Sequence, residues 1–509
     1  MMSQKMATGA AWMFASRVIL NSLGFISTVV LARLLVPDDF GVVAIATAVT
    51  TIVSMITELS LAQSLIRHPD PQSDHFHTAW SLSIIRALIL TAIVIVAAFV
   101  TPVIYGDERL FSIMLMLAGA TFIGGMQNPM VSMPQREMIF TQDVILNIGE
   151  KVVGFIVGVG LALYLRNYFA LIFSVLASQL IRTILSYALS PYRPRFTLSK
   201  WRELLSFSVW VSLSYGLVQI NIKSDALFIG RFATTIDVGH YNMGDRVALI
   251  GVRELMSPLI STLFPAYSRM QGAPDRMAAA YIRAQGLLIC LSFAAGAMLA
   301  LVADPMVRFF LGDKWLDTVP YLQAIAVLLA MNSMQGAREL GMALGASKSV
   351  FQRDLAFAIV RIILVVAGMS LAPMWGFGII AGLLIGRALA TIFDIGNNMV
   401  LVRRLIMVSL SRQIALAIRP LLAATAMAIM IILLHRYIPF SPGKYGEMAQ
   451  MAVAGIVGFS TYGAAILVLN RIRPDPNGPQ IEIMILAGRL FDQLRRRRRT
   501  DSPRMPTDL

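Results

Sequence analysis

The sequence predicts an all-α polytopic membrane protein with about fourteen transmembrane helices. The helices are expected to form two parallel-repeat lobes around a central cationic cavity. Three observations lead to this fold class. The chain is strongly apolar, its apolar runs have the length that crosses a bilayer, and a short motif recurs in its two halves.

Composition places the chain in lipid. Of its 509 residues, 57% are hydrophobic and 14% are charged, and the mean hydropathy is +0.71. A soluble domain carries about 25% charged residues, so a chain this apolar must bury its surface in a bilayer. Much of the net charge of +15 lies in short loops and in the C-terminal tail. This distribution follows the positive-inside rule, so nucleic acid is not an expected partner.

Apolar runs of about 20 residues, bounded by charged or Pro/Gly-rich breaks, mark the spans. They fall near residues 10–35, 41–66, 80–104, 110–128, 141–164, 168–189, 204–232, 241–266, 281–303, 320–337, 354–372, 376–400, 414–434 and 448–470. The first run is too long for the apolar region of a signal peptide, which has about 7–15 residues. It is therefore predicted to be a retained first helix.

The breaks between spans alternate in charge, which predicts the orientation. Residues 37–39, 106–108 and 304–317 form acidic or neutral breaks. The basic breaks contain Arg193, Arg195, Lys200, Arg202, Arg269, Arg276, Arg283, Arg338, Lys348, Arg353, Arg403, Arg404 and Arg412, and the tail continues them. Because basic loops remain in the cytoplasm, both termini are expected there. The expected location is the bacterial cell inner membrane.

Four segments follow from these spans. An N-terminal six-helix lobe covers residues 1–190, and a second six-helix lobe covers 191–402 after the cytoplasmic basic linker 190–202. Two helices that are apolar on all sides, and therefore peripheral, cover 403–473. A basic cytoplasmic tail covers 474–509, and we interpret it as a topology anchor rather than a clamp on anionic membrane lipids.

A short motif recurs at a constant offset of 198 residues. Its members are Arg33, Asp39 and Gly41 in the first copy, and Arg231, Asp237 and Gly239 in the second. Each copy is expected where a polar-dotted helix exits to the periplasm, with the next helix beginning at the glycine. Six spans separate the copies, so the pattern predicts a parallel repeat. Chance combined with ordinary helix-end chemistry is the alternative.

The first two spans of each half carry polar stripes at helical spacing. The stripes are Arg17, Asn21, Gly24 and Thr28; Thr47, Thr51, Ser54 and Glu58; Ser212, Tyr215, Gln219 and Lys223; and Arg246, Arg253, Ser257 and Ser261. Each set lies along one helical face. Lipid cannot satisfy such a stripe, so it must face a water-filled cavity or a polar partner.

Basic residues outnumber acidic residues within the predicted spans. Several, Arg246 among them, lie near predicted span ends and could reach the interface. The cations that are harder to explain in this way are Arg17, Lys223, Arg253 and Arg361. Cations in a cavity attract an anion, and arginine suits phosphate because its planar fork donates two parallel hydrogen bonds. Substrate binding by these four residues is weighed against structural ion pairing.

Other polar groups in the spans have several interpretations. We expect Asn21, Glu58, Gln219 and Asp225 to line the cavity. Glu150 with Lys151, and Arg387 with Asp394, could form local pairs or interhelical ties. Asp225 is interpreted as a structural partner of Lys223 or Arg231. Glu58, Asp225 and Asp394 are the membrane carboxylates that could carry a coupling proton.

No sequence motif for enzymatic chemistry is found. The chain has no phosphate-binding G-x-x-x-x-G-K-[ST], no H-E-x-x-H and no serine-hydrolase elbow. His68, His75 and His77 are interpreted as members of a solvated loop rather than a metal site. We therefore predict a protein that is not an enzyme, with no catalytic residue, metal or cofactor. Its energy would come from an ion gradient or from the substrate gradient.

Four segments resemble the polysaccharide-exporter branch of the multidrug/oligosaccharidyl-lipid/polysaccharide flippase superfamily, and in particular its Wzx-type flippases of exopolysaccharide and colanic-acid pathways. They are Val30 to Gly41 (VLARLLVPDDFG), Trp201 to Phe207 (WRELLSF), Asp225 to Arg231 (DALFIGR), and Leu311 to Trp315 (LGDKW) with Val319-Pro320. The resemblance covers roughly residues 7 to 470, which is nearly all of the predicted spans.

The resemblance implies a V-shaped, two-lobed fold in which spans 1, 2, 7 and 8 frame a cationic cavity. It implies transport of an undecaprenyl-diphosphate-linked oligosaccharide from the cytoplasmic to the periplasmic leaflet by alternating access. The diphosphate would bind the cavity cations, the sugars would remain hydrated within the cavity, and the lipid tail would stay in the bilayer. A polysaccharide polymerase or co-polymerase is an implied partner.

Three other functions are weighed against a flippase. A proton- or sodium-coupled multidrug antiporter of the same superfamily would need an acidic or aromatic pocket for a cationic drug, whereas the surplus charge here is basic. A membrane-embedded polysaccharide polymerase or ligase would need larger periplasmic loops than residues 304–319 provide. A passive scaffold does not explain the polar stripes.

Overall fold

The computed structural model describes residues 19–56, 61, 64, 65, 71–137, 141–441 and 443–472. These residues form helices and connections and include no strand, so the all-α prediction is confirmed. Among them, ten helices are long and apolar enough to cross a membrane, and two shorter apolar helices are Ile19–Leu34 and Arg109–Gly125. The count of fourteen spans and the two-lobed arrangement remain predictions. The tail 474–509 lies outside the described residues.

The chain divides into two compact units, each drawn from several parts of the sequence. The first unit contains residues 1–250, 307–322 and 354–390, and the second contains 251–306, 323–353 and 391–509. Four helical elements pass from one unit to the other: η2 (Leu249–Arg253, a π-helix), α13 (Val319–Asn332), α15 (Ser347–Leu371) and α16 (Ile379–Ile406).

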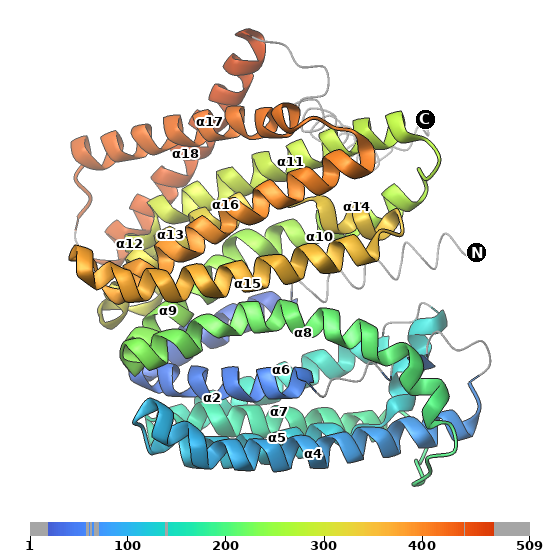
Figure 1. The fold of residues 1–509 in the computed structure, drawn as a ribbon. Helices are drawn as coiled ribbons and strands as arrows, with labels where there is room; N and C mark the ends of the chain where they lie inside the picture. Colours follow the sequence, from blue (N-terminus) through green and yellow to red (C-terminus); the bar gives the residue numbers. More distant parts are fainter. Residues whose placement is uncertain are drawn as a thin grey trace, which may run out of the picture. The chain divides into compact units, whose positions relative to one another are not determined.

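The first unit is built mainly from long helices that lie side by side (Figure 1). Its elements are the helix Ile19–Leu34, α2 (Pro37–Ile56), α4 (Ser73–Tyr105), α5 (Arg109–Gly125), η1 (Pro129–Glu137), α6 (Thr141–Leu165), α7 (Phe169–Ala188), α8 (Trp201–Phe232), α9 (Thr235–Ala248), η3 (Val307–Leu311), η4 (Asp313–Thr318) and η5 (Ala372–Trp375). Helix α4 packs on α5, α6 packs on α7, and α2 packs on α5, α8 and α9.

The second unit has a core centred on α11. Its elements are α10 (Glu254–Ser268), α11 (Pro274–Leu301), α12 (Ala303–Met306), α14 (Ala337–Ala343), α17 (Leu410–Tyr437) and α18 (Lys444–Ile472). Helix α11 packs against α10, α17 and α18. The Tyr462 hydroxyl donates a hydrogen bond of 2.7 Å to the Cys290 carbonyl, which fixes α18 to α11. Cys290 itself is buried, as expected for a small core side chain.

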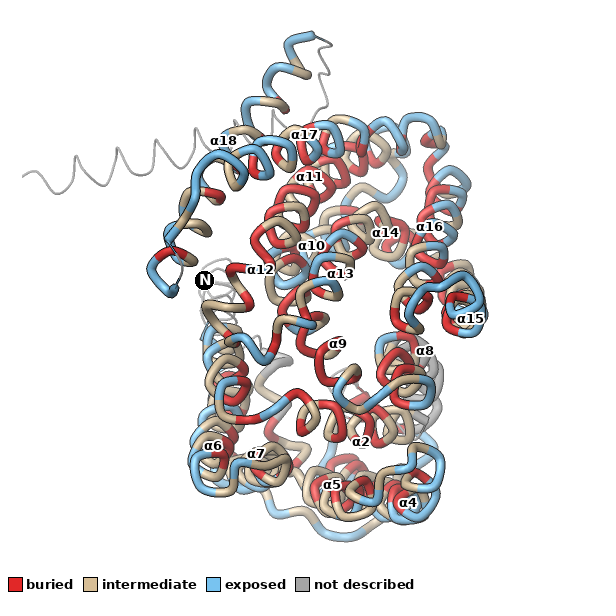
Figure 2. The backbone as a smooth tube through the Cα atoms, turned by 90° about the vertical axis from the view of Figure 1, so that its left-hand side faces the viewer, coloured by how far each residue is buried: buried red, intermediate tan, exposed pale blue. Residues whose placement is uncertain are grey.

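Burial is one-sided along the outer helices, as a lipid environment requires. Figure 2 shows buried residues of α4 and α5 facing neighbouring helices, with exposed residues on the outer side. The exposed residues of α4 are themselves apolar: Val96 and Phe99 are each 63% exposed, and Val103 is 83% exposed. Apolar side chains on the outside of a helix match the hydrocarbon of a bilayer.

The two copies of the repeated motif begin their helices in the same way. The Asp39 carboxylate accepts a 3.2 Å hydrogen bond from the Val36 N–H, and the Asp237 carboxylate accepts one of 3.2 Å from the Thr234 N–H. Each aspartate thus satisfies a backbone donor at a helix N-terminus. The helices therefore begin at Pro37 and Thr235, and the prediction that they begin at the glycines is wrong by one turn.

The repeated glycines form a reciprocal contact between α2 and α9. A Cβ added at Gly41 would lie 1.7 Å from the Thr235 carbonyl oxygen, and one at Gly239 would lie 1.9 Å from the Pro37 carbonyl oxygen. Each pair of equivalent positions is 198 residues apart, so the two contacts are exchanged when the copies are exchanged. Only glycine permits this approach of the two backbones.

The C-terminal end of the first described helix is held by a distant segment. The Lys314 ammonium donates to the carbonyls of Arg33 (2.9 Å) and Leu35 (2.5 Å), and the Trp315 indole N–H donates to Ala32 (2.9 Å). These bonds satisfy carbonyls that the helix leaves open. Burial lowers the pKa of Lys314 below its usual range. Two of the segments that carry the family resemblance thus meet at a helix cap.

Candidate functional site

One cavity of the first unit brings together cations from several helices. We call it the Lys223 cavity; its volume is about 530 Å³. It is lined by residues of the helix Ile19–Leu34, α2, α6, α7, α8 and α9, and therefore by elements from both predicted halves of the chain. Its charged lining residues are Glu150, Lys151, Lys223, Asp245 and Arg246.

The acidic residues of this cavity are already paired. The Glu150 carboxylate accepts a 2.6 Å hydrogen bond from the Arg182 guanidinium, and Asp245 lies 3.5 Å from Arg387. Both arginines belong to the surrounding helices and neutralise the carboxylates locally. The acids are therefore bound to partners other than the three cations that share the cavity with them.

The three cations have no acidic partner among the residues that the structure describes. Lys151 and Arg246 are exposed and Lys223 is partly exposed, and all three line the cavity. No hydrogen bond or ion pair joins any of them to another described side chain. Cations that share a cavity and are not paired with its carboxylates favour an anionic ligand.

The cations lie deep along their helices. Lys223 precedes the end of α8 by nine residues, roughly 14 Å along the axis, and Arg246 follows the start of α9 by eleven residues, roughly 17 Å. The hydrocarbon core of a bilayer is about 30 Å thick, so residues this far from the helix ends are expected to lie within it. A cation at that depth is costly unless a cavity hydrates it or a ligand pairs with it.

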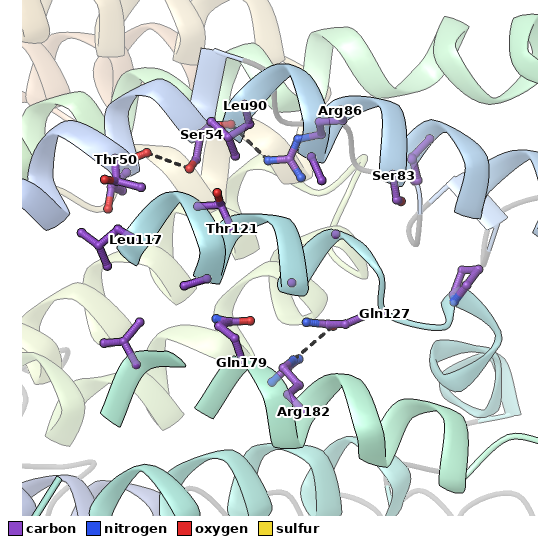
Figure 3. Close-up of a pocket in the computed structure, with 18 of the residues that line it drawn as sticks. Thr50, Ser54, Ser83, Arg86, Leu90, Leu117, Thr121, Gln127, Gln179 and Arg182 are labelled. Atoms are coloured by element: carbon purple, nitrogen blue, oxygen red, sulfur yellow. Dashed lines mark hydrogen bonds between the residues drawn. The ribbon is translucent and has the colours of Figure 1, made fainter. Parts of the chain in front are cut away.

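A second cavity of the same unit, which we call the Arg86 cavity, has a volume of about 520 Å³. Figure 3 shows Thr50 and Ser54 on one side, Arg86 beside them, and Gln179 and Arg182 opposite. The Arg86 guanidinium donates a 3.1 Å hydrogen bond to the Ser54 carbonyl. Hydroxyl and amide groups contribute much of the remaining polar lining.

The two cavities adjoin each other. Thr47, Val175 and Gln179 line both of them. The ion pair between Arg182 and Glu150 also connects them, because Arg182 lines the Arg86 cavity and Glu150 lines the Lys223 cavity. The two cavities therefore share part of their walls.

A buried ionic cluster reaches the wall of the Lys223 cavity at Asp245. The Asp225 carboxylate, 3% exposed, accepts two 2.7 Å hydrogen bonds from Arg361, one of 2.6 Å from the Tyr241 hydroxyl, and lies 3.2 Å from Arg387. Arg387 also forms an ion pair with Asp245, which lines the cavity. The cluster joins α8, α9, α15 and α16.

The structure separates the residues singled out in the sequence. Lys223 lines a cavity, whereas Asp225 and Arg361 are buried together in the ionic cluster and line neither cavity. Asp225 pairs with Arg361 and Arg387, not with Lys223 or Arg231. Gln219 and Asn21 are partly exposed on α8 and on the helix Ile19–Leu34, and also lie outside the lining of the two cavities.

The remaining predicted site residues are distributed elsewhere. Arg253 is exposed at the end of η2, in the second unit. Arg17 and Glu58 lie outside the described residues. In the repeat motif, Arg33 donates to the carbonyls of Phe309 and Phe310, and Arg231 is exposed.

The structure adds Lys151 and Arg246 to the candidate cations. A local pair with Glu150 was one interpretation of Lys151, whereas in the structure Glu150 pairs with Arg182. Arg246 was placed near a span end because its helix was expected to begin at residue 241; α9 begins at Thr235, which places Arg246 a turn and a half deeper. The capping sequence before Asp237 was the signal that could have located this start.

Comparison with known proteins gives a consistent assignment. A model of the family described as "Polysaccharide biosynthesis protein" matches residues 30–320. An uncharacterized membrane protein in the cps region of Klebsiella pneumoniae is 28% identical over 403 residues, covering 76% of this chain and 81% of that protein. The succinoglycan biosynthesis transport protein ExoT of Rhizobium meliloti (strain 1021) is 26% identical, covering 62% and 64%. The lipopolysaccharide biosynthesis protein WzxC of Escherichia coli (strain K12) is 21% identical, covering 65% and 68%.

Solved structures show the same fold. The lipid II flippase MurJ in its inward closed conformation superposes with a TM-score of 0.70 at 15% identity, covering 91% of this chain and 99% of MurJ. An inward-facing MATE-family multidrug transporter superposes with a TM-score of 0.59 at 15% identity, covering 78% and 99%. With the ten spanning helices, these likenesses show a multi-pass membrane protein of this fold.

Proposed function

The chain belongs to the polysaccharide biosynthesis protein family, and from this premise we propose that it is a flippase for lipid-linked oligosaccharides. The resemblance to the flippase superfamily noted in the sequence is confirmed by the family match and by the relatives. In the proposal, an undecaprenyl-diphosphate-linked repeat unit passes from the cytoplasmic to the periplasmic leaflet of the inner membrane, for exopolysaccharide or lipopolysaccharide export.

The observation that carries the proposal is the set of three cations in the Lys223 cavity. Lys151, Lys223 and Arg246 share one cavity, and the carboxylates beside them are bound by other arginines. A diphosphate is the anionic part of the proposed substrate and would bind where charge and hydrogen-bond donors are available. The lipid tail would remain in the bilayer while the headgroup crosses.

The finer parts of the proposal extend this picture to the whole transport cycle. We propose alternating access of two six-helix lobes within about fourteen spans, with both termini cytoplasmic. In other conformations of the transport cycle, the cavity is proposed to extend to further residues predicted from the sequence. Positive potential would then come from Arg17, Arg253 and Arg361. Polar surface would come from Asn21, Glu58, Gln219 and Asp225. A polysaccharide polymerase or co-polymerase is the proposed recipient of the flipped unit.

The positive charge of the Lys223 cavity argues against a multidrug antiporter function for this chain. A lipophilic cation would meet three cations whose neighbouring carboxylates are occupied. The likeness to a MATE transporter is a likeness of fold, which many functions share.

Complementation tests the proposal. In a strain deleted for the gene of this chain, we expect the wild-type protein to restore surface polysaccharide. Lys223→Ala and Arg246→Ala should each lower the initial rate of export by about ten- to a hundredfold, since a hydrogen bond to a charged group contributes about 1.5–3 kcal/mol. Arg17→Ala and Arg253→Ala extend the test to the other predicted cations.

Two controls isolate the role of the charge. Lys223→Arg retains the cation and should restore much of the rate. Arg276→Ala removes an exposed arginine at the start of α11 and should leave export unchanged. All variants are compared at equal membrane levels. Wild-type export by both Lys223→Ala and Arg246→Ala would show that these cations do not contact the substrate.

A further inference from the structure

The Arg86 cavity has a different chemistry from the cationic cavity beside it. Besides Arg86 and Arg182, its lining includes Asp143, so both signs of charge are present. Arg182 is held by hydrogen bonds to Asn147 (2.9 Å) and Glu150 (2.6 Å). Most of the remaining polar residues that line the Arg86 cavity carry neutral hydroxyls and amides. This lining suits a ligand rich in neutral hydrogen-bonding groups.

The hydroxyl wall is formed by one face of α2. Thr47, Thr50, Thr51 and Ser54 each donate their hydroxyl proton to the carbonyl four residues earlier, at 2.6–2.9 Å. The donor of each hydroxyl is thereby used within the helix, while the oxygens of Thr47, Thr50 and Thr51 can still accept a hydrogen bond. The α2 wall of the cavity is therefore a row of acceptors.

The opposite side supplies donors. The Gln127 side-chain oxygen accepts a 3.3 Å hydrogen bond from Arg182, which fixes the amide so that its Nε2 keeps both hydrogen atoms for a ligand. Gln179 lines both cavities, and its amide has no hydrogen-bond partner among the described side chains and backbone. In Figure 3, Gln179 extends from its helix into the cavity.

We propose that the Arg86 cavity is a carbohydrate subsite that holds a sugar of the lipid-linked oligosaccharide while the diphosphate lies in the Lys223 cavity. The inference rests on the proposed function. A sugar hydroxyl is both donor and acceptor, so it matches acceptors on one wall and donors on the other. Leu90 and Leu117 add apolar surface for the C–H face of a sugar ring.

The size and position of the cavity agree with this occupant. A volume of about 520 Å³ lies within the range of small-molecule sites, about 300–1,000 Å³. In the substrate, the first sugar is bonded directly to the diphosphate, so its subsite must adjoin the anion site. The shared lining residues Thr47, Val175 and Gln179 provide this adjacency. Gln179 is then the side chain placed to contact the sugar next to the diphosphate.

The experiment compares two lipids on purified protein in nanodiscs. One is the undecaprenyl-diphosphate-linked oligosaccharide extracted from cells that lack this chain, where the proposed function predicts that it accumulates. The other is undecaprenyl diphosphate. We expect the wild type to bind the glycolipid at least about tenfold more tightly, as a few added neutral hydrogen bonds would provide.

Two variants alter the subsite without touching the cations. Gly124→Leu places a side chain in the cavity, because its Cβ would lie 3.0 Å from the Gln179 amide oxygen. Gln127→Leu removes an amide that lines the Arg86 cavity and not the Lys223 cavity, and keeps the bulk. Each variant should lower glycolipid affinity by about tenfold and change the affinity for undecaprenyl diphosphate by less than twofold. Gln127→Leu provides the test if Gly124→Leu does not fold.

Matched controls separate the possible failures. Gly160→Leu adds the same side chain at an exposed glycine of α6 with nothing within 4 Å of the new Cβ, and should change neither affinity. Lys223→Ala should lower the affinity for both lipids by the same factor. Equal binding of the two lipids by the wild type, or full glycolipid affinity in the subsite variants, would overturn the carbohydrate subsite alone. Failure of the wild type to bind either lipid would overturn the proposed function and the subsite with it.

Discussion

Asp225 shows how one carboxylate can join four helices. It receives hydrogen bonds from Arg361 and Tyr241 and lies within ion-pair distance of Arg387, with 3% of its surface exposed. The buried Arg361 guanidinium therefore depends on this anion, and the partly buried Arg387 shares it with Asp245. Breaking a buried ion pair by removing one partner costs about 3–5 kcal/mol, because the other charge stays buried without compensation.

We therefore expect Asp225→Asn to lower the free energy of unfolding by about 3–5 kcal/mol. Unfolding titrations with sodium dodecyl sulfate would measure it. Adding Arg361→Gln should cost less than the sum of the single changes, because the two side chains interact directly. Asp317→Asn alters a carboxylate that is 88% exposed and should stay within about 0.5 kcal/mol of wild type. An equal effect of Asp225→Asn and Asp317→Asn would contradict this account.

At the scale of elements, the crossing of α2 and α9 depends on two glycines. The Gly41 and Gly239 backbones each face a carbonyl of the other helix too closely for any side chain. The crossing brings Asp38 of α2 to the Thr235 hydroxyl, which donates a hydrogen bond to its carboxylate. The internal repeat is thus a packing contact as well as a sequence pattern.

Gly41→Ala and Gly239→Ala should destabilise the protein by similar amounts. Each methyl group forces the helices apart, and overpacking of this kind costs about 1–3 kcal/mol. Gly160→Ala should instead be neutral or stabilising by up to about 1 kcal/mol, because alanine favours a helix and the site is open. Thermal unfolding of the three variants in the same detergent provides the measurement. Stability of Gly41→Ala at the level of Gly160→Ala would show that the crossing can relax.

At the scale of the molecule, α4 is long enough to cross the whole bilayer. Its 33 residues span roughly 50 Å, more than the hydrocarbon core of about 30 Å. Its first residue, Ser73, accepts a 3.3 Å hydrogen bond from the Tyr192 hydroxyl, so the basic segment after α7 lies at the same end. Gly106 lies at the other end, after Tyr105.

Reporter fusions should therefore give opposite signals at these two ends. A fluorescent protein that folds only in the cytoplasm should be fluorescent after Arg193, and alkaline phosphatase should be active after Asp107. By the positive-inside rule, the basic loop is expected in the cytoplasm. A fluorescent fusion after Ile472 extends the test to the C-terminal end of α18. Phosphatase activity after Arg193 would reverse the proposed orientation.

The helices could be predicted well from the sequence because apolar runs report directly on lipid exposure. The predicted span 204–232 corresponds to α8 (Trp201–Phe232), and 414–434 lies inside α17 (Leu410–Tyr437). The errors occur where polar residues form part of a helix. The span predicted at 241–266 begins at Thr235 and contains the π-helix η2, which local composition does not signal.

The candidate site could be predicted only in part. Helical spacing placed Lys223 on a polar face, and it lines a cavity in the structure. Ion-pair partners could not be inferred, because they depend on helix rotation and register. A local pair or interhelical tie between Arg387 and Asp394 was one interpretation of the sequence, whereas in the structure Arg387 pairs with Asp225 and Asp245. Neutral residues such as Gln179 carry no charge pattern, so their shared position between two cavities emerges only from packing.

The cap on the first described helix has a consequence for the order of events during synthesis. The groups that close its last turn, Lys314 and Trp315, follow Ala32 and Arg33 by more than 280 residues. When the first helix leaves the ribosome and enters the bilayer, these groups do not yet exist, and interfacial water must solvate its final carbonyls. This end of the helix is thus fixed only after α2 to α12 have been made. The turn that ends at Leu34 acquires its final anchorage late in translation.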